Sequence, residues 1–532
     1  MLNTEINEFS AQANLTQVAS YFNIVDNAVK TGDTNKKYTF STNACNAPSA
    51  PIRKGGWTSV IISPTCDNMV DLYNSYITAQ MKVQIKGLGC STIPERCKAP
   101  RIWIGFKDSL QAISQYQILA NGQSIYTQSN AIEEAYITDL ATPESVKKVD
   151  VFSKARHKDI WNPRYAAKCG AFIDLVSGGE NTTYSTTIDL KIDLRRFLPL
   201  SSIRMLPAFV GNIELRLKFS TDGMVIAPSN ILYSVPDYDL RAKINIIDGN
   251  AGDLECKFVP INETFNYINN LNSENNKINY STTEGQTQIM DMEITSCRSH
   301  LACFGLDDNL YQGLVQRYTN ESLSFPIQTL TFNGMNGHID SNNGMVDFTL
   351  TSTPRFVDTI FVLFQKNQNY RTCYENPLFD TFQLKMGGYG VIPDLPFSSF
   401  GPEFLEMVSN AFNTNNDSAG FNKDVMESLV NNVIVEYNNS IESKDVTNYV
   451  MAFPTSTDFT YQQGQTSSTP ITYHLQGVLT RDNNGNVYSP LKESNPIALM
   501  GFLKDSVLAI QLRPQGPPII SLDEYDITSP AE

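Results

Sequence analysis

The stretch that most constrains the fold is Ser75–Lys86, with the sequence SYITAQMKVQIK. Every second residue from Ile77 to Ile85 is apolar, and the residues between them are polar or amphipathic. A helix would scatter these apolar residues around its circumference, whereas a strand places alternate side chains on opposite faces. The pattern therefore predicts a long strand with one face in a core and the other in water.

The same alternation returns far along the chain, in Ile188–Leu194 and in Ile213–Phe219. Asn121-Gly122 predicts a tight turn between two strand-like segments, because both residues tolerate a positive φ. One-sided strands that lie far apart in sequence are typical of packed antiparallel sheets, so we expect an all-β fold. The other segments with strand-like patterns are 57–62, 101–106, 238–247, 323–332, 345–351, 357–364, 447–453, 470–479 and 507–512.

The length of 532 residues is too great for one hydrophobic core, so at least two domains are expected. Gly401-Pro402 begins a helical pattern, because proline is favoured in the first turn of a helix. Roughly helical spacing of apolar residues near the N-terminus fits two interpretations. One is an amphipathic arm that docks on a neighbour or a membrane surface, and the other is a frayed tail or a helix packed on its own domain. The predicted division is an N-terminal arm at 1–48, a first β domain at 49–222, a linker at 223–240, and a second β domain at 241–532 with a helical insertion at about 400–436 and a C-terminal tail.

Charge and cysteine content limit the functional classes. The formal net charge is −15 with 40 Lys and Arg residues. This charge argues against a nucleic-acid-binding protein, because such proteins bind phosphates through a basic surface. The nine cysteines contain no CxxC pair, so we expect free thiols in a reducing compartment. The first residues lack the pattern of a signal peptide, and no apolar run is long enough to predict a transmembrane helix.

Residues able to do chemistry are scattered. No phosphate-binding glycine loop, nucleophile elbow or zinc-binding HExxH motif occurs. Asp307-Asp308 could help to hold a metal, but an exposed acidic turn is the preferred interpretation. The sequence therefore predicts no catalytic, cofactor-binding or metal site and no enzymatic activity. The four histidines, each interpreted as a surface or structural residue, are His157, His300, His338 and His474.

Several segments resemble a known family in their order and spacing. Asp71–Ser75 leads into the long alternating strand, and Asp108–Gly122 combines a short amphipathic stretch, a strand and an Asn-Gly turn. Ile125–Tyr136 follows, and two Leu-Pro pairs precede Asn212–Phe219. Over residues 57–220 this series resembles the major capsid proteins of Maverick/Polinton elements, virophages and related double-stranded DNA viruses.

The resemblance implies a double jelly roll, which is two eight-stranded barrels in tandem. It implies a capsid protein that forms homotrimers with a pseudo-hexameric outline, and these trimers would tile an icosahedral viral shell. The implied partners are further copies of the chain and penton and minor capsid proteins, without sequence-specific binding of nucleic acid. The implied location is the virion, assembled in the cytoplasm or nucleus of the host cell, and contact with an internal membrane stays open. Segments 262–288 and 400–445 are the candidate outer or intersubunit loops.

Two other functional classes share the strand pattern. The first is a multidomain β-sandwich that binds carbohydrate or a cell surface, which predicts a monomer or an elongated oligomer with glycan affinity carried by exposed aromatic residues. The second is a glycoside-processing enzyme, which would need two carboxylates across a cleft. Sequence alone does not place such a pair.

Overall fold

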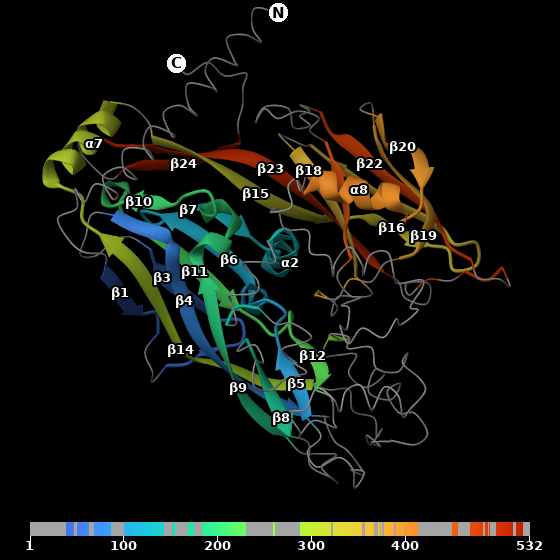
Figure 1. Ribbon diagram of the computed structural model, residues 1–532, viewed down its shortest axis with the longest axis horizontal. Helices are drawn as coiled ribbons and strands as arrows, with labels where there is room; N and C mark the ends of the chain where they lie inside the picture. The colour runs from blue at the N-terminus through green and yellow to red at the C-terminus, as the bar shows by residue number, and fades with distance from the viewer. Residues whose placement is uncertain are drawn as a thin grey trace, which may run out of the picture.

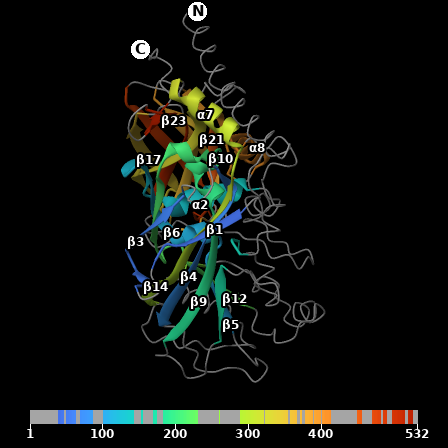
Figure 2. The same cartoon turned by 90° about the vertical axis from the view of Figure 1, so that its left-hand side faces the viewer.

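In the computed structural model, the described residues are mainly antiparallel strands in five sheets, which form two sets (Figure 1). Three sheets make up the first set and two make up the second. Helix α2 (Ala131–Ala141) lies between the two sets in both views (Figures 1 and 2). The residues that the structure describes are 39–46, 50–62, 69–86, 101–142, 152–154, 169–174, 183–229, 259–260, 288–320, 323–353, 357–365, 371–372, 374, 377–387, 390–399, 401–412, 449–455, 469–481, 485–487, 489, 496–513 and 518–524.

The first set contains a six-stranded sheet that faces two four-stranded sheets. The six-stranded sheet consists of β1 (Thr39–Ala44), β14 (Gln288–Phe304), β4 (Met69–Lys86) and β10 (Met205–Pro207), with β2 (Ile52–Arg53) paired to β14 and β9 (Tyr184–Asp193) paired to β4. The four-stranded sheets are β3 (Trp57–Ile61), β11 (Ile213–Phe219), β6 (Ile113–Ala120) and β7 (Gln123–Gln128), and β13 (Val259–Pro260), β12 (Val225–Ser229), β5 (Arg101–Gly105) and β8 (Gly170–Asp174).

The second set consists of two five-stranded sheets. One holds β15 (Leu323–Gly334), β23 (Ile497–Gln511), β18 (Val357–Gln365) and β21 (Met451–Pro454), with β24 (Ile519–Glu524) paired to β23. The other holds β16 (Asn336–Ile339), β17 (Met345–Ser352), β22 (Ile471–Leu479), β19 (Phe379–Met386) and β20 (Gly390–Phe397). From β15 to β23 the chain passes repeatedly from one sheet to the other, which is the winding of a jelly roll.

The long alternating strand is confirmed as β4. From Ser75 to Ile85 every second residue is buried, and the intervening residues are more exposed. The strand begins six residues earlier than predicted, at Met69. Met69, Val70, Asp71 and Leu72 are all buried, so both faces of the strand are covered there and the alternation that predicts a strand disappears.

Most of the other predicted strands that fall on described residues are confirmed. The predicted strand Ile213–Phe219 coincides with β11, and the Asn121-Gly122 turn joins β6 to β7 with positive φ at both residues. The segment 125–136 contains the end of β7 and the start of α2. Strand β23 begins ten residues before the predicted start at residue 507. The predicted strand 238–247 lies outside the described residues.

The buried apolar residues form two cores, one for each set. Two long strands contribute to both, because Phe325 and Ile510 lie in the first core whereas Leu330 and Phe502 lie in the second. Strands β15 and β23 therefore continue from the second set over the first, where β24 and α7 (Asp308–Asn320) also pack (Figure 1).

Strand pairing places segments on both sides of the predicted first domain, from 39–44 to 288–304, in the sheets of the first set. Residues 39–44 of the predicted arm form β1, which pairs with β14, and residues 1–38 lie outside the described part of the chain. Strand β12 falls within the predicted linker at 223–240 but pairs with β5, and β14 pairs with β4. We therefore propose that the first domain continues through α7, which packs in the first core, and that the second begins with β15.

The predicted helical insertion is confirmed in its first part. Helix α8 (Pro402–Ala411) begins after Gly401 with proline in its first turn. Phe404 and Val408 are buried in the second core, so this part of the candidate loop 400–445 belongs to the core. The rest of that loop, and nearly all of the candidate loop 262–288, lies outside the described residues.

Candidate functional site: the junction between the two sheet sets

Helix α2 joins the two cores through its apolar side chains. Ala131 and Ala135 pack in the first core, whereas Tyr136 and Leu140 pack in the second. Because both cores cover the helix, eight of its eleven residues are buried, including two acidic ones. Glu133 and Glu134 therefore need buried partners, since an unpaired charge in an apolar interior is strongly unfavourable.

Glu133 pairs with a cation from the second set. Arg371 lies between β18 and β19, and its Nε and Nη2 atoms donate to the two carboxylate oxygens of Glu133 at 2.8 and 2.6 Å. Gln365, the last residue of β18, donates to the same carboxylate at 3.1 Å. Burial lowers the pKa of Arg371, but the hydrogen bonds and charge of Glu133 outweigh burial and the net shift is upward. A bidentate Arg–carboxylate pair fixes both the distance between the two side chains and their relative orientation.

Glu134 is held by uncharged donors. Its carboxylate accepts from the Tyr116 hydroxyl at 2.7 Å, from the Gln128 side-chain amide at 2.5 Å, and from the backbone N–H of Leu198 at 3.1 Å. Burial raises the pKa of Glu134 to about 7, although these hydrogen bonds act in the opposite direction. Glu134 therefore titrates near neutrality inside the molecule.

Further hydrogen bonds cross from the first set to the second. Gln128 of β7 also donates to the backbone oxygen of Leu330 in β15 at 2.7 Å. The hydroxyl of Tyr136 in α2 donates to the backbone oxygen of Tyr449, just before β21, at 2.9 Å. These bonds satisfy buried polar atoms, and they are lost if the two sets separate.

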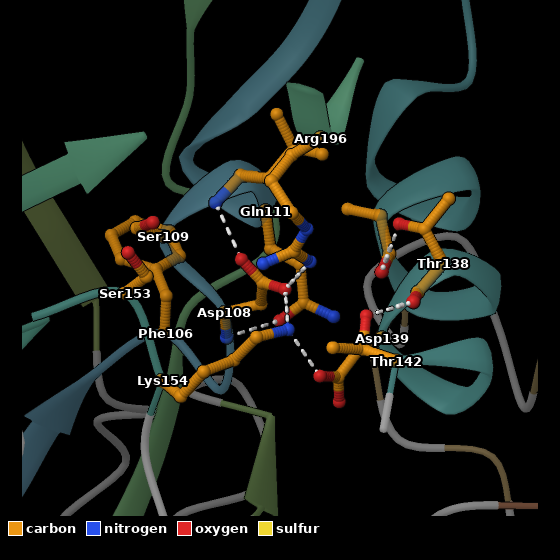
Figure 3. Close-up of polar contacts among 12 residues, drawn as sticks. Phe106, Asp108, Ser109, Gln111, Thr138, Asp139, Thr142, Ser153, Lys154 and Arg196 are labelled. Carbon is orange, nitrogen blue, oxygen red and sulfur yellow. Dashed lines mark hydrogen bonds and ion pairs between the residues drawn. The ribbon is translucent and has the colours of Figure 1, made fainter. Parts of the chain in front are cut away.

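A buried ionic cluster fixes α2 to the first set (Figure 3). Asp108 is fully buried and accepts from Lys154 and Arg196, and Lys154 also contacts Asp139 in α2. Asp108 also caps the 3₁₀ turn Ser109–Ala112, where its side chain accepts from the N–H of Leu110 at 2.9 Å. Two carboxylates and two cations balance one another, so the cluster is neutral as a whole.

The residues considered as candidates for chemistry do not converge. His300 stacks on Tyr76 with ring centroids 4.7 Å apart, and it bonds the Thr42 and Thr78 hydroxyls at 3.0 and 2.9 Å. Burial lowers the pKa of His300. The Nε2 atom of His474 in β22 lies 2.6 Å from the Oδ1 atom of Asp347 in the neighbouring strand β17. His338 lies in β16, and His157 is outside the described residues.

Asp307-Asp308 lies at the start of helix α7. Asp307 accepts from the N–H of Asn309 at 3.1 Å, and Asp308 begins α7. Among the residues that the structure describes, no group of three or more His, Cys, Asp or Glu side chains is placed to hold a metal ion. No helix in the same ranges is long and apolar enough to cross a membrane.

Sequence reasoning missed the buried charges of the junction. Lys154 lies in the charged segment 141–170, where charged side chains are expected to face solvent, yet its own side chain is only 5% exposed. Arg371 and Glu133 are 238 positions apart in the chain. Two adjacent glutamates in an otherwise apolar run, Ile132–Ile137, are the local signal that could have pointed to buried partners.

Comparisons with known proteins find structural relatives only. No protein-family profile and no curated protein sequence matches the chain. The crystal structure of the mavirus major capsid protein superposes with a TM-score of 0.51 and 9% identity, covering 93% of each chain. The structure of the Sputnik virophage superposes with a TM-score of 0.53 and 10% identity, covering 93% of this chain and 90% of the other. The chain therefore has the double jelly-roll fold of these viral proteins.

Proposed function

We propose that this protein is a major capsid protein that assembles into homotrimers, and that these trimers tile an icosahedral viral shell. The observation that carries the proposal is the extent of the structural likeness, which spans both sheet sets and nearly the full length of the mavirus and Sputnik chains. A likeness confined to one barrel would fit many unrelated β proteins.

The junction explains how two barrels could act as one building block. The Glu133–Arg371 pair and the bonds from Gln128 and Tyr136 hold the sets in one orientation. Three chains with two such barrels each would place six similar barrels in a ring. A ring of six gives the pseudo-hexameric outline that fills a lattice without gaps.

We propose that exposed apolar side chains contribute to contacts between chains. Strand β3 ends its sheet among the described strands, and Trp57 and Ile61 on its outer face are 42% and 49% exposed. An edge strand presents unpaired backbone groups, and stable oligomer interfaces are richer in apolar side chains than the average surface. The other large apolar side chains with high exposure are Tyr73, Phe152, Met290, Met345, Leu395 and Ile519.

The finer assignments are part of the same proposal. We expect penton and minor capsid proteins as partners, residence in the virion after assembly in the host cell, and no sequence-specific contact with nucleic acid. Residues 1–38, before β1, would act as an arm that ties neighbouring trimers together or faces an internal membrane. Deleting them should leave trimers intact and impair shell formation, and normal shells from the deletion variant would refute that role.

The solution mass of the purified protein tests the proposal. Light scattering after size exclusion should show one compact species at three times the chain mass of 59.3 kDa. A stable monomer at all concentrations would contradict the trimer and favour the carbohydrate- or surface-binding alternative. A glycan array then distinguishes that alternative, because it predicts a bound glycan whereas a shell protein does not require one.

A further inference from the structure

We propose that Cys45 and Cys297 form a reversible disulfide that fastens strand β1, the first described strand, onto β14. The proposal concerns the thiol chemistry of this pair and does not depend on the capsid function. It rests on the register of the two strands, on contact between the two thiols and on the weak packing of β1.

The register places the two cysteines opposite each other. In the β1–β14 ladder Ala44 lies opposite Arg298, so the next residues, Cys45 and Cys297, face one another. The N–H of Cys45 donates to the backbone oxygen of Cys297 at 2.8 Å. The N–H of Cys297 donates to the side chain of Asn46 at 2.7 Å, so one backbone hydrogen bond joins the two cysteines. Directly opposite residues of antiparallel strands have Cα atoms about 4.5–5.5 Å apart, which lies inside the range that a disulfide spans.

The two thiols also contact each other directly. A hydrogen bond from the Cys297 thiol lowers the pKa of Cys45, and the same contact together with burial raises the pKa of Cys297. Cys45 is half-buried, whereas Cys297 is buried. Cys45 is therefore the thiol that ionises first and that a reagent reaches first.

Oxidation needs a two-electron acceptor, for which we name a low-molecular-weight disulfide such as oxidised glutathione. The Cys45 thiolate attacks one sulfur of this reagent, forms a mixed disulfide and releases one glutathione thiolate. Cys297 then loses its proton and attacks the Cys45 sulfur, which forms the protein disulfide and releases the second thiolate. Two protein thiols are oxidised and the reagent is reduced to two thiols.

Strand β1 is a segment on which such a bond would act. It lies at the edge of its sheet, and Ser41, Thr42, Asn43 and Ala44 are half-buried or exposed. Cys45, directly after the strand, packs against the first core. Because edge strands with few buried side chains open readily, a covalent bond at this position should reduce local opening of β1.

Tryptic peptide mapping tests the bond in the full-length protein. Cleavage after Lys37 and Arg53 isolates Cys45, and cleavage after Lys277 and Arg298 isolates Cys297, so each peptide contains one cysteine. After incubation with oxidised glutathione under native conditions, we expect the two peptides to be linked and to lose about 2 Da relative to their sum. Reduction should restore both free thiols.

Cys303 provides an internal control. It lies on β14 opposite Thr39 on one side and Val70 on the other, so no cysteine faces it in the ladder. Its peptide should therefore remain unlinked in the same sample. A stable glutathione adduct on Cys45, or two fully alkylated peptides after oxidation, would overturn the proposal.

Hydrogen exchange measures the consequence for the strand. Oxidation should slow amide exchange in residues 39–45 and leave β17, in the second sheet set, unchanged, and the variant Cys45→Ser should show no response to the oxidant. Because Cys45 is half-buried and serine is similar in size, this variant is expected to fold. Equal exchange of β1 in the oxidised and reduced protein would show that the bond does not fasten the strand.

Discussion

The two sheet sets are stabilised differently beside their cores. In the first set a buried ionic cluster links Asp108, Lys154 and Arg196. In the second set, aromatic rings pack against one another instead. The ring of Phe382 contacts those of Phe397, Phe404 and Phe453, with ring centroids 5.3 to 6.1 Å apart.

The two kinds of interaction differ in how strictly they depend on geometry. Charges fix geometry strictly, and removing one partner leaves another charge buried without compensation. Aromatic packing is less directional, and neighbouring rings can shift to fill part of a lost volume. The first set should therefore be more sensitive to a single polar substitution than the second is to a conservative apolar one.

The largest loss of folding stability is expected for Asp108→Asn. This change keeps the shape of the side chain, removes the ion pair of Arg196 with Asp108, and leaves Asp139 as the ion-pair partner of Lys154. We expect a loss of about 3–5 kcal/mol in the free energy of unfolding, measured by denaturant titration. The control is Glu214→Gln, which breaks an exposed pair with Arg216 and should change stability by about 0–1 kcal/mol. Equal effects of the two variants would contradict the role of the cluster.

The next effect concerns the ion pair that crosses the junction. Arg371→Gln leaves Glu133 buried without its cation and should destabilise the protein by about 2–4 kcal/mol. The double variant Glu133→Gln/Arg371→Gln removes both charges and should recover part of this loss in the same denaturant titration. Strictly additive losses would show that the two residues do not interact.

Glu134 predicts a dependence of stability on pH. Its pKa is about 7 in the folded protein and about 4.5 in the unfolded chain, so the folded state holds the proton more tightly. Stability should therefore be highest below about pH 4.5 on account of this group and fall as the pH rises through 7, by roughly 3 kcal/mol in total. Above pH 7 the full cost of burying the charge is present.

The variant Glu134→Gln isolates this contribution. Thermal unfolding between pH 5 and 8 should show a flatter profile for the variant than for the parent protein, with the variant more stable at pH 8. Burial also raises the pKa of Asp505 to about 6, so the difference between the two proteins, and not the parent curve alone, reports Glu134. Parallel curves would contradict the assignment.

The smallest effect is expected in the aromatic cluster. Phe382→Leu removes one ring but keeps an apolar side chain of moderate size, so the loss should be about 1–2 kcal/mol. Denaturant titration against Asp108→Asn makes the comparison direct. A loss as large as that of the charge variant would show that the second set is no more tolerant than the first.

The sequence predicts the one-sided strands well because their signal is local. Strand β11 is predicted in full, and β4 is predicted wherever one face is covered and the other is not. Alternation disappears at Met69–Leu72, where both faces are buried, and it does not predict the first half of β23. Helix α2 gives a weak helical signal for the same reason, since cores cover it on opposite sides.

The junction could not be predicted because its contacts join residues that are distant in sequence. Asp108 meets Lys154 and Arg196, and Glu133 meets Arg371, without any local pattern that pairs them. The pairing of β14 with β4 across more than 200 residues likewise lies beyond local reasoning, and the sequence-based boundary at 223–240 does not account for it.

Imaging of the purified oligomer by electron microscopy tests the central claim most directly. We predict a particle of three chains with a hexagonal outline, in which six barrel-shaped densities form a ring and two belong to each chain. A particle with three separate lobes, or two barrels in variable orientation within one chain, would contradict a building block held rigid at α2.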